Sequence, residues 1–489
     1  MPNNFQILAV SLIGLVLFKG CDKAPKYAKP SVATPAAYKE IAPAAFKETD
    51  DWKFAHPADA MIRGKWWEIF NDPQLNSLEE QLNTANQNIA LADANFRAAR
   101  ALVKESRSGY FPTVTTSPSI IVSRQSAAAT HSNVSPGRVA TNYSLPFDAS
   151  WEPDFWGRIR NTVVASTSEA QATAADLQNV RLSVEAELAF DYYQLRSVDA
   201  EKALLDSTIA AFQEELDLTR VRFETGIVSD EDVAQSETQL KTTQAQATDL
   251  GIQRAQLEHA IALLTGQPAS TFSLPVAPLD TKPPEVPVGL PSQLLERRPD
   301  IAAAERRVAE ANAEIGVTKA AFFPSLVLSA TGGLESTSIA SWFTWPARFF
   351  SLGPTLSQTL FDKGRRKAQT EFARAQYDAT AASYRNTVLT SFQEVEDNLA
   401  ALRILSRELE QQNEAVASAQ RALTLAVERY KSGIDSYLNV ITAQATLLNN
   451  QRTAVNLQAQ QMTASVELIK ALGGGWNAAN LPTQKQLVK

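Results

Sequence analysis

The chain has 489 residues, of which 20% are charged, and a formal net charge of −7. This acidic balance argues against a nucleic-acid surface, which needs clustered positive charge. One cysteine excludes an internal disulfide, and three scattered histidines, His56, His131 and His259, do not predict a zinc site. The sequence contains no Ser/His/Asp or Cys/His set and no phosphate-cradling glycine loop, so we expect no enzyme, no cofactor and no metal site.

The N-terminus resembles a lipoprotein export signal. An apolar run from Ile7 to Phe18 is shorter than the about 20 residues of a membrane-spanning helix. Cys21 follows a glycine there, so residues 1–20 are expected to be a signal peptide and 21–60 a tether lipidated at Cys21. The first residues carry no basic side chain, and Lys19 stands where a small or apolar residue is usual. A signal peptide without lipidation therefore remains the alternative.

The folded part begins with a first repeat over residues 61–267. A helical pattern runs from Pro73 to Ser106 and is stopped by Pro112. Two strands are predicted, at about 113–126 and 143–154. The second is the clearer, because apolar side chains alternate with polar ones at a period of two: the apolar set is Tyr143, Leu145, Phe147, Ala149 and Trp151.

Two long helical hairpins follow the strands. Apolar residues recur at helical and coiled-coil spacing from near Ile159 and again from Arg365, with breaks at Gly226 and Gly433. Glycine adopts the left-handed backbone that ends a helix, so each break is predicted to be a tip between antiparallel helices. The first helix of each pair has roughly 60 residues and a length of about 90 Å. Charged residues on these helices, such as Glu394 and Glu396, are expected on solvated faces.

The second repeat, residues 292–476, reproduces the first. It has a helical pattern over 293–321 and strands at about 325–339 and 349–361. Three glycine pairs share one offset: 364 − 157, 433 − 226 and 473 − 266 all equal 207. A constant offset indicates tandem duplication. A Pro-rich linker, 268–291, separates the repeats, and 477–489 form a C-terminal tail.

Four strands pose a closure problem. A membrane barrel needs about eight strands, and an open sheet would leave unpaired backbone groups in lipid. The strands must close by oligomerisation, form a soluble sheet, or not be membrane strands. Tryptophans at the strand ends suit a membrane interface, although they could equally pack a soluble core: they are Trp151, Trp156, Trp342 and Trp345.

With these motifs, the chain resembles the outer membrane factor (TolC-like) family, and within it the NodT/OprM-like lipoprotein channels of efflux pumps. The resemblance rests on the duplicated pattern, the segment Asp148 to Arg160, the two tips and the ending Ala471 to Trp476. It implies a mainly α protein with membrane β structure. Three protomers would form a twelve-stranded outer-membrane β-barrel, continued by a long α-helical barrel into the periplasm. The polar strand face would line the lumen: Asp148, Ser150 and Glu152.

The resemblance also implies a function and partners. The protein would be the outer-membrane channel of a tripartite efflux pump, a passive exit for drugs or other small toxic molecules. Its partners would be two further protomers of a homotrimer, a periplasmic membrane-fusion adaptor, an inner-membrane transporter of the RND type and outer-membrane lipid. The alternatives are an exit duct for secreted polypeptides and, in another class, a soluble periplasmic coiled-coil adaptor or structural protein. The adaptor alternative predicts a single hairpin without duplication.

The expected functional residues gather at the tips. Asp232 matches a pore-facing aspartate of the family, although a carboxylate there would equally cap its own helix. Leu438 matches an apolar constriction. Asn439 and Thr442 stand where relatives often have aspartates. Tyr430 and Asp435 match positions that would tie the closed tips together, through Arg222 or Arg429. Gly226 and Gly433, in the turns of the tips, would dock the adaptor.

Overall fold

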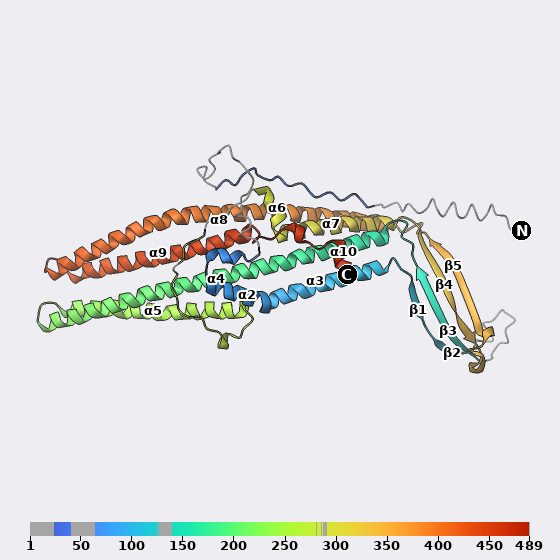
Figure 1. Ribbon diagram of the computed structural model, residues 1–489, viewed down its shortest axis with the longest axis horizontal. Helices are drawn as coiled ribbons and strands as arrows, with labels where there is room; N and C mark the ends of the chain where they lie inside the picture. Colours follow the sequence, from blue (N-terminus) through green and yellow to red (C-terminus); the bar gives the residue numbers. More distant parts are fainter. Residues whose placement is uncertain are drawn as a thin grey trace.

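The computed structural model describes residues 24–40, 64–124, 126, 139–279, 281–284, 286 and 291–488. Cys21, His56 and His131 lie outside these ranges. The molecule is elongated, with a sheet at one end and the tips of two helical hairpins at the other (Figure 1). Across the described ranges, no helix combines the length and the apolar character needed to cross a bilayer.

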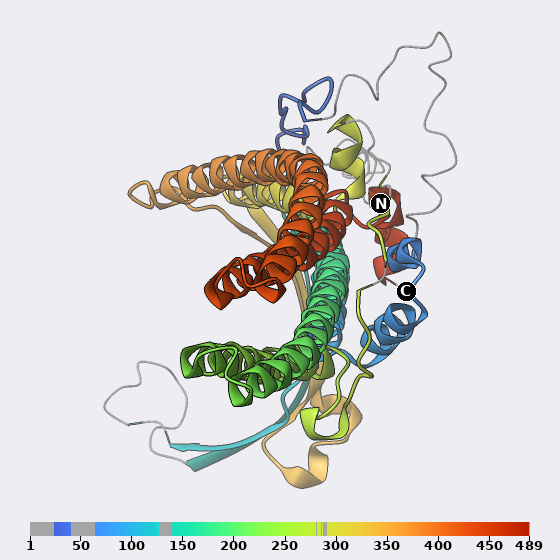
Figure 2. The ribbon, with the colours of Figure 1, turned by 90° about the vertical axis from the view of Figure 1, so that its left-hand side faces the viewer.

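Two helical hairpins of equal size form the long part. The first pairs α4 (Arg158–Glu224, 67 residues) with α5 (Asp230–Leu264, 35 residues). The second pairs α8 (Arg365–Lys431, 67 residues) with α9 (Tyr437–Ala471, 35 residues). All four helix bounds differ by 207, as in 365 − 158 and 471 − 264, so the predicted duplication is confirmed down to the helix ends. Figure 2 looks onto the two tips, which lie beside each other.

Each long helix begins with a left-handed glycine and an aspartate that accepts backbone hydrogen bonds. Gly157 (φ 77°) and Gly364 (φ 89°) stand at the N-caps in the left-handed region that favours glycine. Asp154 accepts hydrogen bonds from two backbone N–H groups of the first turn of α4, at 3.0 and 2.8 Å. Asp362 accepts from the backbone N–H of the N-cap Gly364 at 3.1 Å and of Arg366, in the first turn of α8, at 3.2 Å. These carboxylates satisfy N–H groups that have no partner within the helix.

The helix predicted over Pro73 to Ser106 is in fact two helices, α2 (Pro73–Ala85) and α3 (Gln87–Ser108). The break lies at Asn86, whose backbone is extended and whose side chain caps α3. Its amide also donates to the carbonyl of Leu264, the last residue of α5, at 2.9 Å. A tertiary contact thus overrides the local helical pattern.

The second repeat has the same joint. The predicted helix over 293–321 is split into α6 (Leu294–Arg297) and α7 (Pro299–Ala320). Arg298 stands at the break and donates to the carbonyl of Ala471, the last residue of α9, at 3.0 Å. The same side chain pairs with Asp300 (2.6 Å) and Glu394 (2.6 Å). Glu394 therefore makes an ion pair where the sequence predicted a solvated face.

The sheet is antiparallel throughout, in the order β1-β3-β4-β5, with β2 also paired to β3. The strand predicted over 113–126 is divided into β1 (Thr113–Thr116) and β2 (Ser119–Arg124), because Pro118 between them has no N–H to donate. The prediction 143–154 was displaced: β3 is Val139–Trp151, and Pro153 follows its end. In the second repeat, β4 (Ser325–Ser336) and β5 (Arg348–Ser357) both end earlier than predicted. β5 ends at Ser357 because that residue already pairs with Ser325, the first residue of β4.

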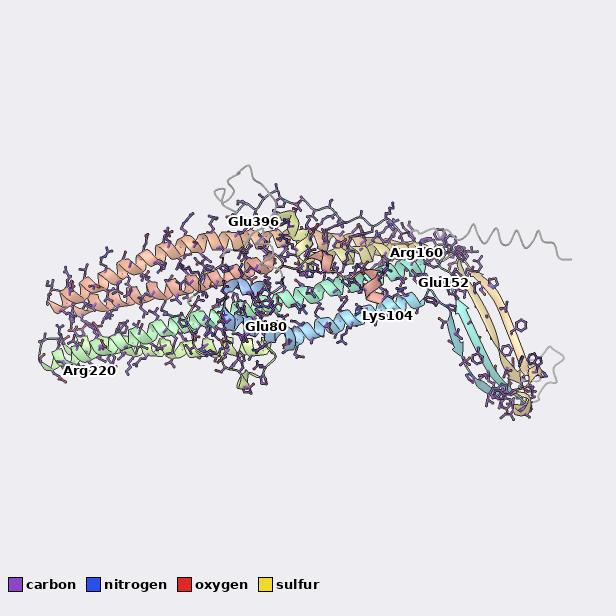
Figure 3. The ribbon with its side chains drawn as sticks, in the orientation of Figure 1. Glu80, Lys104, Glu152, Arg160, Arg220 and Glu396 are labelled. Atoms are coloured by element: carbon purple, nitrogen blue, oxygen red, sulfur yellow. The ribbon has the colours of Figure 1, made fainter. Side chains whose placement is uncertain are left out.

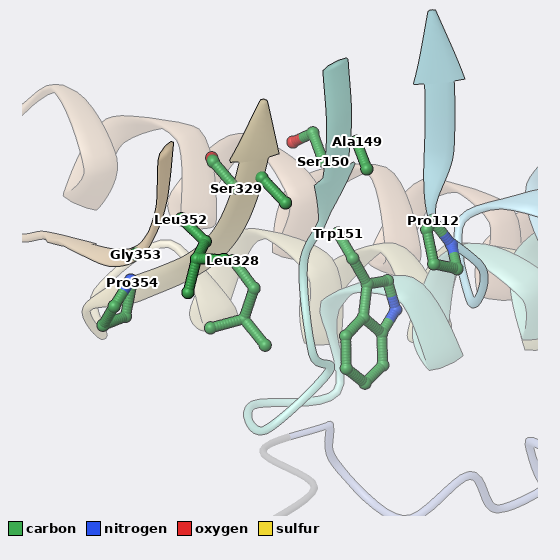
Figure 4. A pocket seen from close by; sticks show the side chains of 10 residues that line it. Pro112, Ala149, Ser150, Trp151, Leu328, Ser329, Leu352, Gly353 and Pro354 are labelled. Carbon is green, nitrogen blue, oxygen red and sulfur yellow. The ribbon is translucent and has the colours of Figure 1, made fainter. Parts of the chain in front are cut away.

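The sheet has one polar and one apolar face. The strand register aligns Thr115, Asp148, Thr331 and Ser351 in one row across the sheet. Thr331 donates its hydroxyl to Asp148 at 2.7 Å. The opposite face is apolar, and at its helical end a shallow hollow is shown in Figure 4, lined among others by Trp151, Leu328, Leu352 and Pro354.

The tryptophans at the strand ends lie outside the main core. Trp156 stacks on Phe323 with ring centroids 4.8 Å apart, at the junction of sheet and helices. Trp345, at the far end, is 74% exposed. The fully buried tryptophan of the core is instead Trp66, which is 1% exposed. The core surrounds it midway along the molecule, where η3 (Trp66–Phe70) and α2 meet α4, α5 and α9.

Residues 24–40 form an N-terminal strap that runs along α7 and α8 (Figure 1). Tyr38 is 5% exposed and inserts into the core of the second repeat. Glu396 accepts hydrogen bonds from the backbone N–H groups of Lys39 (2.7 Å) and Glu40 (3.0 Å). Glu396, labelled in Figure 3, therefore holds this strap, whereas the sequence predicted a solvated face.

The duplicated joint predicts an unequal pair of glycine substitutions. Gly266 (φ 70°) and Gly226 (φ 74°) share a left-handed backbone, which costs an L-residue about 1–2 kcal/mol. A Cβ on Gly266 would lie 2.6 Å from the carbonyl oxygen of Ala85, whereas a Cβ on Gly226 meets nothing within 4 Å. Gly266→Ala should therefore lower the free energy of unfolding by about 1–3 kcal/mol more than Gly226→Ala. Denaturant unfolding measures both, and equal losses would contradict the close approach.

Candidate functional site at the helical tips

The two tips share one backbone turn. Gly226 and Gly433 have φ values of 74° and 72°, and their N–H groups donate to the carbonyls of Phe223 (2.8 Å) and Tyr430 (3.0 Å). This geometry satisfies carbonyls left without partners where the helices end. A Cβ on either glycine would meet nothing within 4 Å. The tips of this chain therefore offer open backbone at the end farthest from the sheet.

Asp232 lies in the first turn of α5 and takes part in capping it. Its carboxylate accepts from the backbone N–H of Ser229 at 3.4 Å, which completes a capping box. The side chain is half-buried. Burial, and to a smaller extent the charge of Asp232, raises the pKa of Tyr430. The capping interpretation is thus present in the structure, and the pore-facing role of Asp232 remains a prediction.

Asp435 pairs with Arg429 across the turn of the second tip. The Nε–Oδ2 distance is 2.5 Å, and both side chains are solvent-accessible. The hydrogen bond from Arg429 holds the pKa of Asp435 below its usual range, with a smaller contribution from Asn439. Asp435 is therefore a carboxylate at neutral pH. Because both partners belong to the same hairpin, this ion pair stiffens one tip and does not join the two tips.

Tyr430 makes the contact between the two tips. The guanidinium of Arg222, on α4, lies 5.3 Å from the centroid of the Tyr430 ring, on α8. Tyr430 also packs on Tyr437, with ring centroids 5.2 Å apart. Of the two partners that the sequence offered, Arg222 thus lies beside Tyr430 and Arg429 beside Asp435.

Further polar contacts join the hairpins behind the tips. Glu201 of α4 pairs with Arg452 of α9 at 2.6 Å. Nearer the tip, Glu215 of α4 accepts from Gln444 of α9. Burial raises the pKa of Glu215, while the hydrogen bond from Gln444 lowers it. These two pairs could not be predicted from the sequence, because their partners are 251 and 229 residues apart and no local pattern connects them.

The remaining predicted residues lie on the first two turns of α9. Leu438 is 57% exposed in this chain, and Asn439 and Thr442 are also exposed. Thr442 uses its hydroxyl to donate to the carbonyl of Leu438 at 2.8 Å. The structure thus gathers all the predicted gate residues at one end of the molecule. Over the ranges that the structure covers, no group of three or more His, Cys, Asp or Glu side chains could hold a metal ion.

Comparison with known proteins gives a consistent family. The family model described as outer membrane efflux protein matches residues 72–267 and 290–474. A toluene efflux pump outer membrane protein of Pseudomonas putida, TtgF, is 31% identical over 99% of this chain and 100% of its own length. The pyoverdine export outer membrane protein OpmQ of Pseudomonas aeruginosa is 30% identical over 96% of this chain and 97% of its own.

Solved structures share the whole architecture. The outer-membrane channel OprN superposes with a TM-score of 0.83 at 31% identity, covering 93% of this chain and 100% of its own. The outer membrane protein VceC of Vibrio cholerae has a TM-score of 0.78 at 27% identity and covers 84% of this chain and 99% of its own. The elongated two-hairpin fold and its sheet are therefore those of outer-membrane channels.

Proposed function

The chain belongs to the outer membrane efflux protein family, and on this premise we propose that it is the passive exit duct of a tripartite pump for small apolar toxic molecules. The observation that carries the proposal is the join between a two-faced sheet and the 67-residue helices α4 and α8. A helix of that length extends about 100 Å, far beyond a bilayer about 30 Å thick. One end suits the outer membrane, and the other reaches into the periplasm.

The proposed assembly is a homotrimer. Within one chain, β1 and β2 at one side and β5 at the other each pair with a single neighbouring strand. Open edges are unfavourable in lipid. With β1 and β2 counted as one interrupted strand, each chain would contribute four strands, and three chains would close one twelve-stranded barrel. The polar row through Asp148 and Thr331 would then face the lumen, and the exposed Phe350 and Leu352 would face lipid.

Lipidation of Cys21 is part of the proposal. The strap brings Ala24 against Gly316 on α7, four residues before that helix ends and leads into β4. Three peptide units separate Ala24 from Cys21, a reach of at most about 10 Å. An acyl chain on Cys21 would thus start close to the level of the sheet. This placement supports the lipidated alternative over a signal peptide without lipid.

The proposed partners are a periplasmic membrane-fusion adaptor and an inner-membrane transporter of the RND type. The adaptor would dock at the open turns of Gly226 and Gly433, where close backbone approach is possible. Relatives are named for the efflux of toluene, solvents and antibiotics, which supports small apolar cargo. We propose that Leu438 and Asp232 narrow the pore and that Tyr430 and Asp435 favour its closed state.

The proposed duct is tested by Gly433→Trp in a strain that lacks the gene. Wild type should restore tolerance to toluene, whereas the bulky side chain should block docking and leave the strain sensitive. Gly433→Ala is the control, because it changes the same backbone by one methyl group in open space. Outer-membrane trimers must be present at equal levels in all strains. Full tolerance with Gly433→Trp, or in the strain without any copy, would contradict the proposal.

The contact between the tips predicts a larger conductance for Tyr430→Leu. The substitution removes the ring that faces Arg222, an interaction of about 0.5–1 kcal/mol at an exposed site. A bias this small in each protomer is reversible by partner binding. The measurement is single-channel conductance of the isolated trimer in a planar bilayer.

Tyr430→Phe is the matched comparison, since it keeps the ring and removes only the hydroxyl, whose interaction with Arg222 lowers the pKa of Tyr430; its conductance should lie between those of wild type and Tyr430→Leu. Asp435→Ala should have the smaller effect, because its pair with Arg429 stiffens only one tip. The lowered pKa of Asp435 means that its stabilising contribution is present at neutral pH and is lost only as the pH falls through that lowered pKa. A Tyr430→Leu channel that conducts like wild type places the gate elsewhere.

The pore-facing role of Asp232 predicts a change in ion selectivity. Three symmetric carboxylates would attract cations, so Asp232→Asn should reduce the cation preference of the isolated channel. Reversal potentials across a salt gradient measure this preference. Asp230→Asn is the control, because Asp230 is exposed in the same turn and its substitution removes the same charge. Equal shifts from both variants would point to a general surface charge and not to a ring at Asp232.

A further inference from the structure

A carboxyl group without any partner lies in the main core. Glu79, in the middle of α2, is 0% exposed, and among the described residues neither of its carboxylate oxygens has a hydrogen-bond partner. It projects from the same buried side of the helix as Leu75, Leu78 and Leu82, which are at most 1% exposed. Burying an unpaired carboxylate is very unfavourable, and such groups usually remain protonated.

A second carboxyl group faces it from α4. Glu185 is 5% exposed, and it accepts a hydrogen bond from the indole N–H of Trp66 at 3.0 Å. Asn83, one turn after Glu79 on α2, donates its amide to the backbone carbonyl of Glu79 at 3.0 Å and lowers the pKa of Glu185, so it leaves the Glu79 carboxyl unpaired. The polar partners at this place therefore serve Glu185 and leave the Glu79 carboxyl with none. Two neighbouring buried carboxyl groups resist simultaneous ionisation.

The other groups around Glu79 offer it little compensation. Tyr193 of α4 is fully buried, and its hydroxyl also has no partner among the described residues. The charge of Arg181 on α4 lowers the pKa of Glu185, and the charge of Asp72 at the start of α2 raises the pKa of Tyr193. The exposed Glu80 pairs with Lys65 outside the core. The apolar side chains that α5 and α9 contribute to this core are Ile261, Leu264, Met462, Val466 and Ile469.

On its buried side, helix α2 is held by polar contacts at its two ends, whereas the Lys65–Glu80 and Gln267–Gln81 contacts lie on its exposed side. At its start, Tyr192 of α4 donates its hydroxyl to Asp72 at 2.7 Å. At its end, Asn86 donates to the carbonyl of Leu264 at 2.9 Å. Between them, the attachment depends on apolar burial around Glu79. A charge at this position would have to be accommodated by moving the middle of the helix towards water.

We propose that Glu79 is a proton-binding site of the core, occupied at neutral pH, and that loss of its proton loosens α2 from α4. Burial first, and the charge of Glu185 second, raise the pKa of Glu79 well above its usual value. For a raised carboxyl pKa, the packing of the neutral form is fully stabilising below the unfolded pKa. That contribution is lost as the pH rises through the folded pKa. The packing of α2 should therefore weaken in alkaline solution.

The proton itself can be observed in the full-length trimer. Infrared spectra of wild type at neutral pH should contain a carboxylic-acid C=O band that Glu79→Gln lacks and Glu80→Gln retains. The band should disappear as the pH is raised. If the wild-type and Glu79→Gln spectra do not differ in this band at any pH, Glu79 is ionised in the core and the proposal is overturned.

Stability gives an independent readout. Glu79→Gln keeps the shape of the neutral acid, so its melting temperature should equal that of wild type below the unfolded glutamate pKa of about 4.3. It should exceed wild type increasingly as the pH rises from there towards the folded pKa, by a few degrees or more in alkaline solution. Hydrogen exchange of the α2 amides, compared between the two proteins at each pH, should diverge in the same range. Glu80→Gln should follow wild type throughout. Parallel pH profiles for wild type and Glu79→Gln would overturn the proposal.

Discussion

The arrangement of the long helices depends on a joint that occurs twice. A helix of 67 residues cannot be positioned by its own hydrogen bonds, and its partner helix must be fixed where the hairpin returns to the core. Asn86 and Arg298 provide this fixation by donating to the last carbonyls of α5 and α9. Gly266 and Gly473 allow the chains to approach closely enough. The same geometry thus recurs with an amide in one repeat and a guanidinium in the other.

Fixation at one end leaves the other end weakly held. Behind the tips, the hairpins are joined by the Glu201–Arg452 pair and by the hydrogen bond from Gln444 to Glu215. At the tips themselves, Arg222 and Asp232 of the first hairpin interact with Tyr430 of the second, all on partly exposed surface. Local opening is favoured where buried contacts are few. A gate at this end can therefore move without disturbing the core, which lies midway along the molecule.

The repeat, the hairpins and the alternation of the strands could be predicted from the sequence. Each of them produces a local periodicity of apolar residues or a constant spacing between matching glycines. The sequence could not predict the breaks at Asn86 and Arg298, since both depend on carbonyls from helices distant in sequence. It assigned Glu396 to a solvated face, because the strap that covers it is far away in the chain. At the tips, it found the residues and offered both arginines without deciding which pairs with which acid or ring.

The two repeats differ in charge at their tips. At the tips, Asp232 in the first repeat corresponds to Asn439 in the second, since 439 − 232 is again 207. One hairpin thus carries a carboxylate and the other a neutral amide at the same place. Asn439 lowers the pKa of Asp435, whose negative charge is already balanced by its ion pair with Arg429. The uncompensated negative charge is therefore concentrated on the first tip, and in a symmetric trimer it would form a single acidic ring alternating with neutral positions.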